Sequence, residues 1–196
     1  MDKPIPMGVK ETGELWRDSY ITPQYITSAI KHVFPEGWLD PCPQEWEESH
    51  GDGLDIGSFT ESASKNVYIN PPFSQYQRWT DAWLEHETSN QIWICHTNNS
   101  SQWYKDLERA SDLICLLNNR VKFIDPRTGL PSESSAIGKS QTVFFKIADT
   151  SIPVINSESW KMRQRFIEAF GSQRRFENKK GKFTLGMIWK PCCVHQ

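Results

Sequence analysis

Long apolar runs are missing from this sequence. No stretch of its 196 residues approaches the roughly 20 consecutive apolar residues that a membrane-spanning helix needs, and residues 1–10 lack an apolar signal core. The chain nevertheless contains 9 Trp and 10 Phe, which supply bulky side chains for a core. Its length suits one folded domain. We therefore expect an ordered cytoplasmic protein with no membrane partner.

Paired cysteines are also missing. The five cysteines are an odd number and show no CxxC spacing, which argues against a disulfide framework and against a zinc cluster. Cys95 and Cys115 lie inside apolar runs, so we expect buried, reduced thiols. Cys192, Cys193 and His195 could bind a metal, but a terminal tail seldom preorganises a site, and we predict no metal.

The charge is nearly balanced over the whole chain but not within its last part. The formal net charge is only -2, yet residues 161–190 carry nine Lys or Arg against two Glu. Such a segment either contacts a polyanion or is a solvated charged face. The helix predicted over 158–170 places Met162, Phe166 and Phe170 on one face and leaves its cationic side exposed.

Helix and strand patterns alternate along the rest of the chain. The spacing of apolar residues predicts a helix that starts at Pro23 with Thr22 as its cap, helices over 76–86 and 101–110, and strands over 38–39, 67–70, 91–95, 113–117, 121–124 and 142–147. This alternation indicates an α/β fold with a mostly parallel sheet covered by helices on both faces. Ligands of such sheets bind beyond the carboxyl ends of the strands. Asp40-Pro41 and Asn70-Pro71 both follow predicted strands, so we expect them to face one crevice.

The string Asn70-Pro71-Pro72-Phe73 ends one of these strands abruptly, because proline has no N–H with which to continue a ladder. It presents a side-chain amide and fixed backbone carbonyls in a stiff corner. The Asn70 side-chain oxygen and the Pro71 carbonyl could hold a planar amino group such as that of adenine, and Phe73 offers a face for ring stacking. The alternative is a loop whose prolines merely end the strand.

This corner resembles the (D/N)PP(Y/F) motif of amino methyltransferases that use S-adenosylmethionine. The motif alone leaves three substrates open: adenine N6, cytosine N4 and protein glutamine. Its surroundings resemble, more narrowly, the bacteriophage and prophage DNA adenine-N6 methyltransferase family. The shared features are TP before a helix, LDPC at a strand end, DGL in a loop, NPPF, a WY helix and NRVKF, and they run from Thr22 to about Phe145.

The resemblance implies a Rossmann-like class I methyltransferase fold, S-adenosylmethionine as cofactor and double-stranded DNA as partner. It makes Asn70, Pro71, Pro72 and Phe73 catalytic. The cofactor-binding residues that it implies are Thr22, Pro23, Asp40, Pro41, Cys42, Asp52 and Leu54. The sequence departs from the usual pattern in lacking Gly-x-Gly after Asp40-Pro41, and it leaves the acidic ribose ligand open among Glu45, Glu47 and Glu48.

The downstream segments offer candidates for DNA contact. Residues 96–99 could line the pocket, although a polar turn is the stronger interpretation. Arg120 and Lys122 belong to the NRVKF element, where Arg120 could touch phosphate or form a surface ion pair. The Gly/Pro/Ser-rich segment 125–140 exceeds the usual connection length and could close over the substrate base. In the basic C-terminus, phosphate contacts are predicted for Arg174, Arg175, Lys179 and Lys180.

Three segments follow from this reading of the chain: an N-terminal arm over 1–20, a catalytic domain over 21–150, and a basic helix and tail over 151–196 packed on the same domain. The predicted function is methyl transfer to the N6 amino group of adenine in DNA, with the base flipped out of the helix. Two alternatives stay open. One is a methyltransferase acting on RNA or protein glutamine, and the other is a noncatalytic nucleic-acid-binding relative. If the chain is phage-encoded, its compartment is the host cytoplasm.

Overall fold

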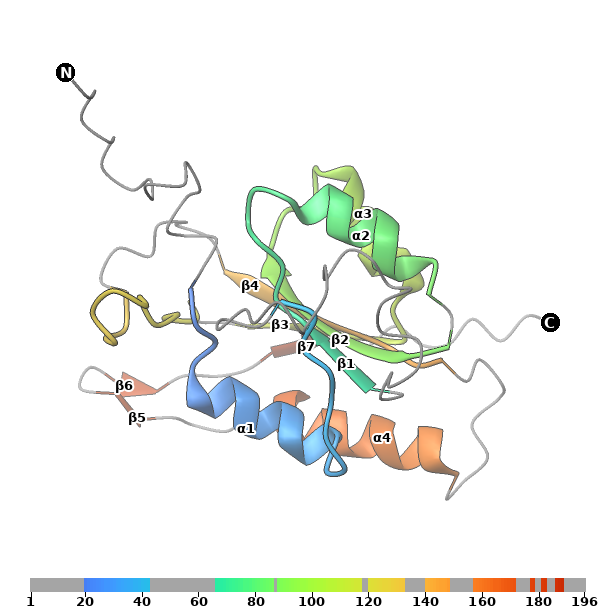
Figure 1. The fold of residues 1–196 in the computed structure, drawn as a ribbon. Helices are drawn as coiled ribbons and strands as arrows, with labels where there is room; N and C mark the ends of the chain where they lie inside the picture. Colours follow the sequence, from blue (N-terminus) through green and yellow to red (C-terminus); the bar gives the residue numbers. More distant parts are fainter. Residues whose placement is uncertain are drawn as a thin grey trace.

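The computed structural model describes residues 20–42, 66–86, 88–117, 120–132, 140–148 and 157–171, together with the backbone of 177–178, 181–182 and 186–188. These ranges form three layers, with a β-sheet between two groups of helices (Figure 1). One face is covered by α2 (Tyr76–Leu84) and α3 (Gln102–Ala110). The other is covered by α1 (Gln24–Val33) and by α4 (Glu158–Phe166), which continues into the π-helix η4 (Ile167–Gly171). None of the helices in these ranges combines the length and the apolarity of a bilayer-spanning segment.

The central sheet is mixed. Its strand order is β1-β2-β4-β3-β7, with β1 at Asn66–Ile69, β2 at Asn90–His96, β3 at Leu113–Leu116, β4 at Gln141–Lys146 and β7 at Gly186–Ile188. A separate antiparallel pair joins β5 (Glu177–Asn178) to β6 (Gly181–Lys182). The pairing of β1 with β2 is parallel, and Leu39 adds a parallel bridge to Val67.

The prediction of a mostly parallel sheet was wrong because of β4. This strand lies between β2 and β3 and runs antiparallel to both, and β7 is antiparallel to β3. Parallel neighbours need a crossover, usually helical, and the described residues contain no helix between β3 and β4. The α/β class is confirmed.

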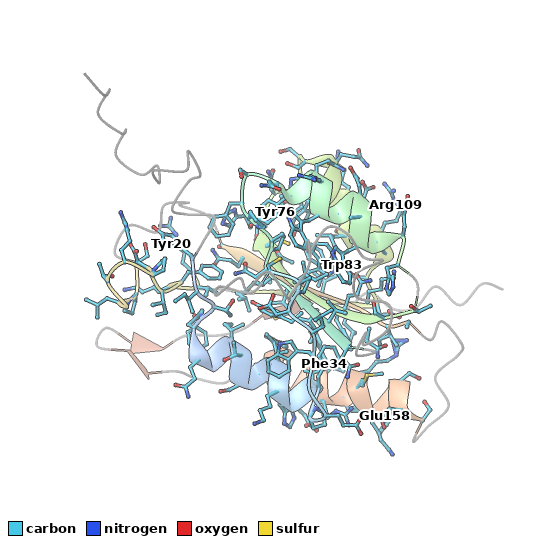
Figure 2. The ribbon with its side chains drawn as sticks, in the orientation of Figure 1. Tyr20, Phe34, Tyr76, Trp83, Arg109 and Glu158 are labelled. Atoms are coloured by element: carbon cyan, nitrogen blue, oxygen red, sulfur yellow. The ribbon has the colours of Figure 1, made fainter. Side chains whose placement is uncertain are left out.

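Two hydrophobic cores hold the layers together. Figure 2 shows Phe34 and Trp83 on opposite sides of the sheet, and the two residues belong to different cores. Neighbouring residues of β4 also divide between them, since Phe145 faces α1 and α4 while Phe144 faces α2 and α3. Phe145 stacks on Phe166 of α4 with ring centroids 4.9 Å apart. The sheet is therefore buried on both faces.

Helix α1 begins at Gln24, with Pro23 as its N-cap. The prediction that Thr22 caps this helix was wrong, because the Thr22 hydroxyl bonds instead to the Tyr68 hydroxyl of β1. Ile26, Ile30 and Val33 are buried at helical spacing against the sheet. The start of α1 is thus tied to the end of β1.

Helix α4 buries its apolar face as predicted, with Met162, Phe166 and Phe170 all in the core. Its cationic side is less exposed than the sequence predicted, because two of its arginines are paired. Arg163 lies 2.9 Å from Asp112, and Arg165 pairs with Glu158 and donates to the Val33 carbonyl. These arginines fix the helix to the sheet and to α1, because each holds an acceptor that is partly shielded from water.

Polar side chains near the start of β2 and at the end of β4 hold α2 in place. The buried Gln91 side chain donates to the Trp83 and His86 carbonyls at 2.9 and 3.0 Å. Lys146 donates to the Leu84 carbonyl at 2.9 Å. Carbonyls at the end of a helix have no partner within the helix, so these bonds satisfy them. They also fix the distance between α2 and the sheet.

Segment 120–132 forms a turn beside the start of α1, although the sequence predicted a strand over 121–124. Ile124 makes antiparallel bridges to Ile21 and to Pro131 but joins no strand of the central sheet. The Asp125 carbonyl accepts from the Gly129 N–H at 2.8 Å, and Gly129 has a φ of 66° that favours glycine. Figure 1 shows this yellow segment projecting past the beginning of α1.

Cys95 in β2 and Cys115 in β3 are buried, as predicted. Burial raises the pKa of Cys95 well above its ordinary value and raises the pKa of Cys115 to about 12. Both thiols therefore stay protonated and behave as small hydrophobic side chains. Cys192, Cys193 and His195 lie outside the described residues.

Candidate active site

Three strand ends meet at one edge of the sheet. Leu39 is parallel to Val67 in β1, and β1 is parallel to β2, so the residues that follow these strands leave the sheet on the same side. Asp40 follows the first, Asn70 the second and Thr97 the third. The backbone of Asn70 also makes a hydrogen bond to the Cys42 thiol. The two Asp/Asn-Pro corners therefore lie together, as the sequence predicted.

The Asn70 side-chain amide is bonded on one side only. Its Nδ2 donates to Thr22 Oγ1 at 3.3 Å. Its Oδ1 is buried and has no hydrogen-bond partner within the described ranges. A buried carbonyl oxygen nearly always has a donor, and leaving it without one costs about 1–3 kcal/mol. This arrangement suits a ligand that supplies an N–H group.

Asp40 forms the second polar element of the site. Its Oδ1 accepts from the Cys42 backbone N–H at 2.9 Å, which closes a tight turn around Pro41. The carboxyl is half-buried, and burial raises the pKa of Asp40 to about 6 despite that hydrogen bond. A carboxylate held in such surroundings favours a cationic neighbour.

Aromatic side chains surround Phe73. Its ring centroid lies 4.4 Å from that of His96, 5.8 Å from that of Phe123 and 6.0 Å from that of Tyr76. Phe73 itself is only half-buried, so part of its ring stays accessible. Tyr76 accepts the His96 backbone N–H through its hydroxyl at 3.3 Å. These contacts set the orientation of the Phe73 ring, three residues after Asn70 in the chain.

His96 lies against Phe73 at the strand ends, a position that the sequence interpretation offered only as the weaker alternative. The sequence favoured a polar turn over 96–99, but His96 is the last residue of β2 and its side chain is buried against Phe73. A histidine that directly follows the apolar run 92–95, at the edge where ligands bind, could have indicated this position. Thr97 and Asn98 are half-buried at the same edge.

The structure brings together only some of the predicted site residues. Five of them lie around the strand ends: Thr22, Asp40, Cys42, Asn70 and Phe73. The neighbouring prolines Pro23, Pro41 and Pro71 are buried, and Pro72 is half-buried. Arg120 and Lys122 are exposed on the segment whose Phe123 touches Phe73. Other predictions lie outside the described residues, namely Asp52, Leu54, Glu45, Glu47, Glu48, Arg174, Arg175, Lys179 and Lys180.

Comparison with known proteins gives one match. The family model described as DNA N-6-adenine-methyltransferase (Dam) matches residues 9–169. That span contains all three strand ends and the Asn-Pro-Pro-Phe corner. No curated protein and no solved structure matches the chain.

Proposed function

Because this chain belongs to the DNA N-6-adenine-methyltransferase (Dam) family, we propose that it transfers a methyl group from S-adenosylmethionine to the N6 amino group of adenine in DNA. The family match confirms the resemblance read from the motifs. The observation that carries the proposal is the buried Asn70 Oδ1, an acceptor without a donor among the described residues. An exocyclic amino group supplies such a donor.

The role of the corner follows from the chemistry of the amino group. The lone pair of an aromatic amine is delocalised into the ring, which makes the nitrogen a poor nucleophile. Asn70 Oδ1 and the Pro71 carbonyl would accept its two hydrogens, turn its lone pair toward the methyl group and stabilise the positive charge that develops on nitrogen. This is preorganised electrostatic stabilisation, so the site needs no strong general base.

Among the described residues, those that would hold the cofactor are Asp40, Pro41 and Cys42 after the first strand end, together with Thr22 and Pro23 before α1. S-adenosylmethionine would supply an electrophilic methyl group on a sulfonium centre. The positive charges of that molecule fit the raised pKa of Asp40, because a nearby cation would favour the carboxylate. Asp52 and Leu54 are proposed to border the adenine of the cofactor, on the strength of the motif resemblance.

The DNA base must leave the duplex to reach this site, since the N6 amino group is paired inside the helix. We propose that the base is flipped, at an expense of a few kcal/mol that stacking on Phe73 partly offsets. We propose that Arg120 and Lys122, which are exposed on the segment whose Phe123 contacts Phe73, bind phosphate, and that Arg174, Arg175, Lys179 and Lys180 do so along the C-terminus.

The parallel arrangement of Leu39, β1 and β2 supports a Rossmann-like arrangement at the site. In open α/β sheets of this kind, ligands bind outside the carboxyl ends of parallel strands. The antiparallel strands β4 and β7 lie on the side of β2 that faces away from β1. We therefore propose the methyltransferase fold for the half of the sheet that carries the corner.

Methyl transfer from tritium-labelled cofactor to separate DNA, RNA and protein substrates tests this function. The proposal predicts label in unmethylated duplex DNA, recovered as N6-methyladenine after digestion to nucleosides. Label in RNA or in protein glutamine would replace the proposed substrate with one of the alternatives. A protein that binds DNA but not the cofactor, as measured by calorimetry, would be a noncatalytic relative.

A further inference from the structure

A buried tyrosine hydroxyl lies at the end of a hydrogen-bond chain that leads to Asn70. Tyr68 is 1% exposed in β1, and its hydroxyl oxygen is 2.9 Å from Thr22 Oγ1. Thr22 Oγ1 in turn accepts from Asn70 Nδ2 at 3.3 Å. The three side chains come from two segments more than forty residues apart in the sequence, so only the folded chain brings them together.

The direction of these hydrogen bonds follows from what each group can donate. A buried hydroxyl hydrogen needs an acceptor, and in the described part of the chain the Tyr68 hydroxyl is bonded to Thr22. Burial raises the pKa of Tyr68 well above its ordinary value, so the phenol keeps its proton. With Tyr68 as the donor, Thr22 Oγ1 accepts from both Tyr68 and Asn70 Nδ2. Both lone pairs of Thr22 Oγ1 are used in this way.

This direction matters because an amide can turn over. The torsion that rotates the Asn amide is two-fold, so Oδ1 and Nδ2 can exchange places with little change in shape. With Nδ2 outward, the amide would present donors to an amino group that also donates. With Oδ1 outward, it presents the acceptor that the proposed reaction needs.

We propose that Thr22 and Tyr68 are positioning residues that fix the Asn70 amide with its oxygen toward the reacting amino group. This inference rests on the proposed function. The scaffold suits the role, since the backbone of Ile21 is held to Ile124 by two hydrogen bonds of 2.9 Å and Pro23 is the N-cap of α1. Tyr68 and Asn70 are two residues apart at the end of β1, so both project to the Thr22 side.

Replacing Thr22 removes the shared acceptor with little change in volume. Thr22→Val should lower the single-turnover rate by roughly 10- to 100-fold, because the amide can then adopt either orientation and a buried hydroxyl loses its acceptor. The dissociation constant for S-adenosylmethionine should change much less. Thr22→Ser, which keeps the hydroxyl, should recover most of the rate. Thr27→Val in α1, whose hydroxyl donates to the Gln24 carbonyl at 3.0 Å, serves as the matched control.

The Asn70→Asp background separates orientation from general structural support. A carboxylate presents an oxygen whichever way it turns, so Thr22→Val should reduce the rate of Asn70→Asp by much less than it reduces the rate of the parent protein. Equal factors in the two backgrounds would overturn the inference. So would a loss that appears mainly in cofactor affinity, because the Thr22 hydroxyl would then serve the cofactor contact proposed for Thr22-Pro23 and not the positioning of Asn70.

A measurement that does not depend on activity keeps the inference apart from the proposed function. In a ¹H–¹⁵N spectrum, the Asn70 side-chain amide is identified by its disappearance in Asn70→Ala. Its hydrogens should exchange slowly with solvent in the parent protein and in Thr22→Ser, and faster in Thr22→Val. Unchanged exchange in Thr22→Val would overturn the bond to Thr22. Absence of methyl transfer by the parent protein, with the exchange pattern as expected, would instead remove the proposed function.

Discussion

The half-buried carboxyl of Asp40 lowers the stability of the folded chain at neutral pH, and the same carboxylate would favour binding of a cationic ligand. The pKa of its carboxyl rises from 3.8 to about 6 on folding, chiefly through burial. Between those two pH values the folded chain holds a proton that the unfolded chain has lost. The free energy of unfolding therefore falls as the pH rises through this window, and it stays lowered above about pH 6. A cationic ligand beside Asp40 would favour the charged form of its carboxyl.

Asp40→Asn should accordingly stabilise the protein and weaken cofactor binding. At pH 8 the free energy of unfolding should rise by up to about 3 kcal/mol, because the buried charge is gone while an oxygen remains for the Cys42 N–H. The gain should disappear toward pH 4, where both side chains are neutral. Urea denaturation at the two pH values measures this, with the exposed Asp81→Asn as control. A variant that keeps full cofactor affinity would mean that Asp40 does not face the cofactor.

At the scale of single residues, the sequence predicted the position of the Asn70-Pro71-Pro72-Phe73 corner but not the hydrogen bonds that link Asn70 to Thr22 and Tyr68. Asn70 and Asp40 could be found because proline beside a polar residue at a strand end is a local pattern. Tyr68 lies within the strand predicted over 67–70, and its ring is buried. The role of its hydroxyl depends on Thr22, a partner 46 residues away, and no local pattern encodes such a pairing.

At the scale of elements, α4 is fixed by an ion pair that should be tested. Asp112 accepts from the Ile147 N–H at 2.8 Å and from Arg163 at 2.9 Å, and burial raises the pKa of its carboxyl despite these bonds. The side chains of Arg163 and Asp112 are 13% and 21% exposed. Removing one partner of such a pair leaves the other charge uncompensated in a poorly solvated place.

Arg163→Met should lower the free energy of unfolding by about 2 kcal/mol, as measured by chemical denaturation. Lys161→Met on the same helix is the matched control, because Lys161 is exposed and lies 4.0 Å from Glu158, and its effect should stay below about 0.5 kcal/mol. Adding Asp112→Asn to Arg163→Met should recover part of the loss. Equal effects of the two single variants would show that the Arg163 pair contributes no more than a surface pair.

The elements themselves were more predictable than their arrangement. The helices α1 to α4 and the strands β1 to β4 lie within a few residues of their predicted positions, since each has an apolar pattern of its own. The predicted direction of β4 was wrong. Phe144 and Phe145 face two different cores, and a strand that is buried on both faces has the continuous apolar sequence typical of a parallel strand. Segment 121–124 has the composition of a strand, yet Ile124 pairs only with Ile21 and Pro131 in bridges.

At the scale of the whole molecule, the distribution of positive charge bears on DNA binding. The arginines of α4 pair with Asp112 and Glu158, so they are poorly placed to contact phosphate. The predicted phosphate contacts of the C-terminus therefore depend on residues that follow the helix. Their side chains lie outside the described ranges, and their role stays a prediction.

Neutralising Arg174, Arg175, Lys179 and Lys180 together should weaken DNA binding and flatten its salt dependence. Each lost phosphate contact should reduce the slope of log K against log salt by up to about 0.9, because fewer condensed counterions are released. Cofactor affinity should not change. The control neutralises Arg78 and Lys105, which are exposed on α2 and α3. Equal salt slopes for the parent and the quadruple variant would place the DNA contacts elsewhere, with Arg120 and Lys122 as the next candidates.

The central claim is that the buried oxygen of Asn70 activates an adenine amino group. Its most direct test compares the parent protein with Asn70→Ala in single-turnover methylation of unmethylated duplex DNA, with the product identified by nucleoside mass spectrometry and cofactor affinity measured by calorimetry. We predict N6-methyladenine from the parent, a rate lower by about 100-fold or more in Asn70→Ala, and nearly equal cofactor affinities, because one preorganised acceptor has been lost. Near-normal turnover in Asn70→Ala, or a modified base other than N6-methyladenine, would contradict this account.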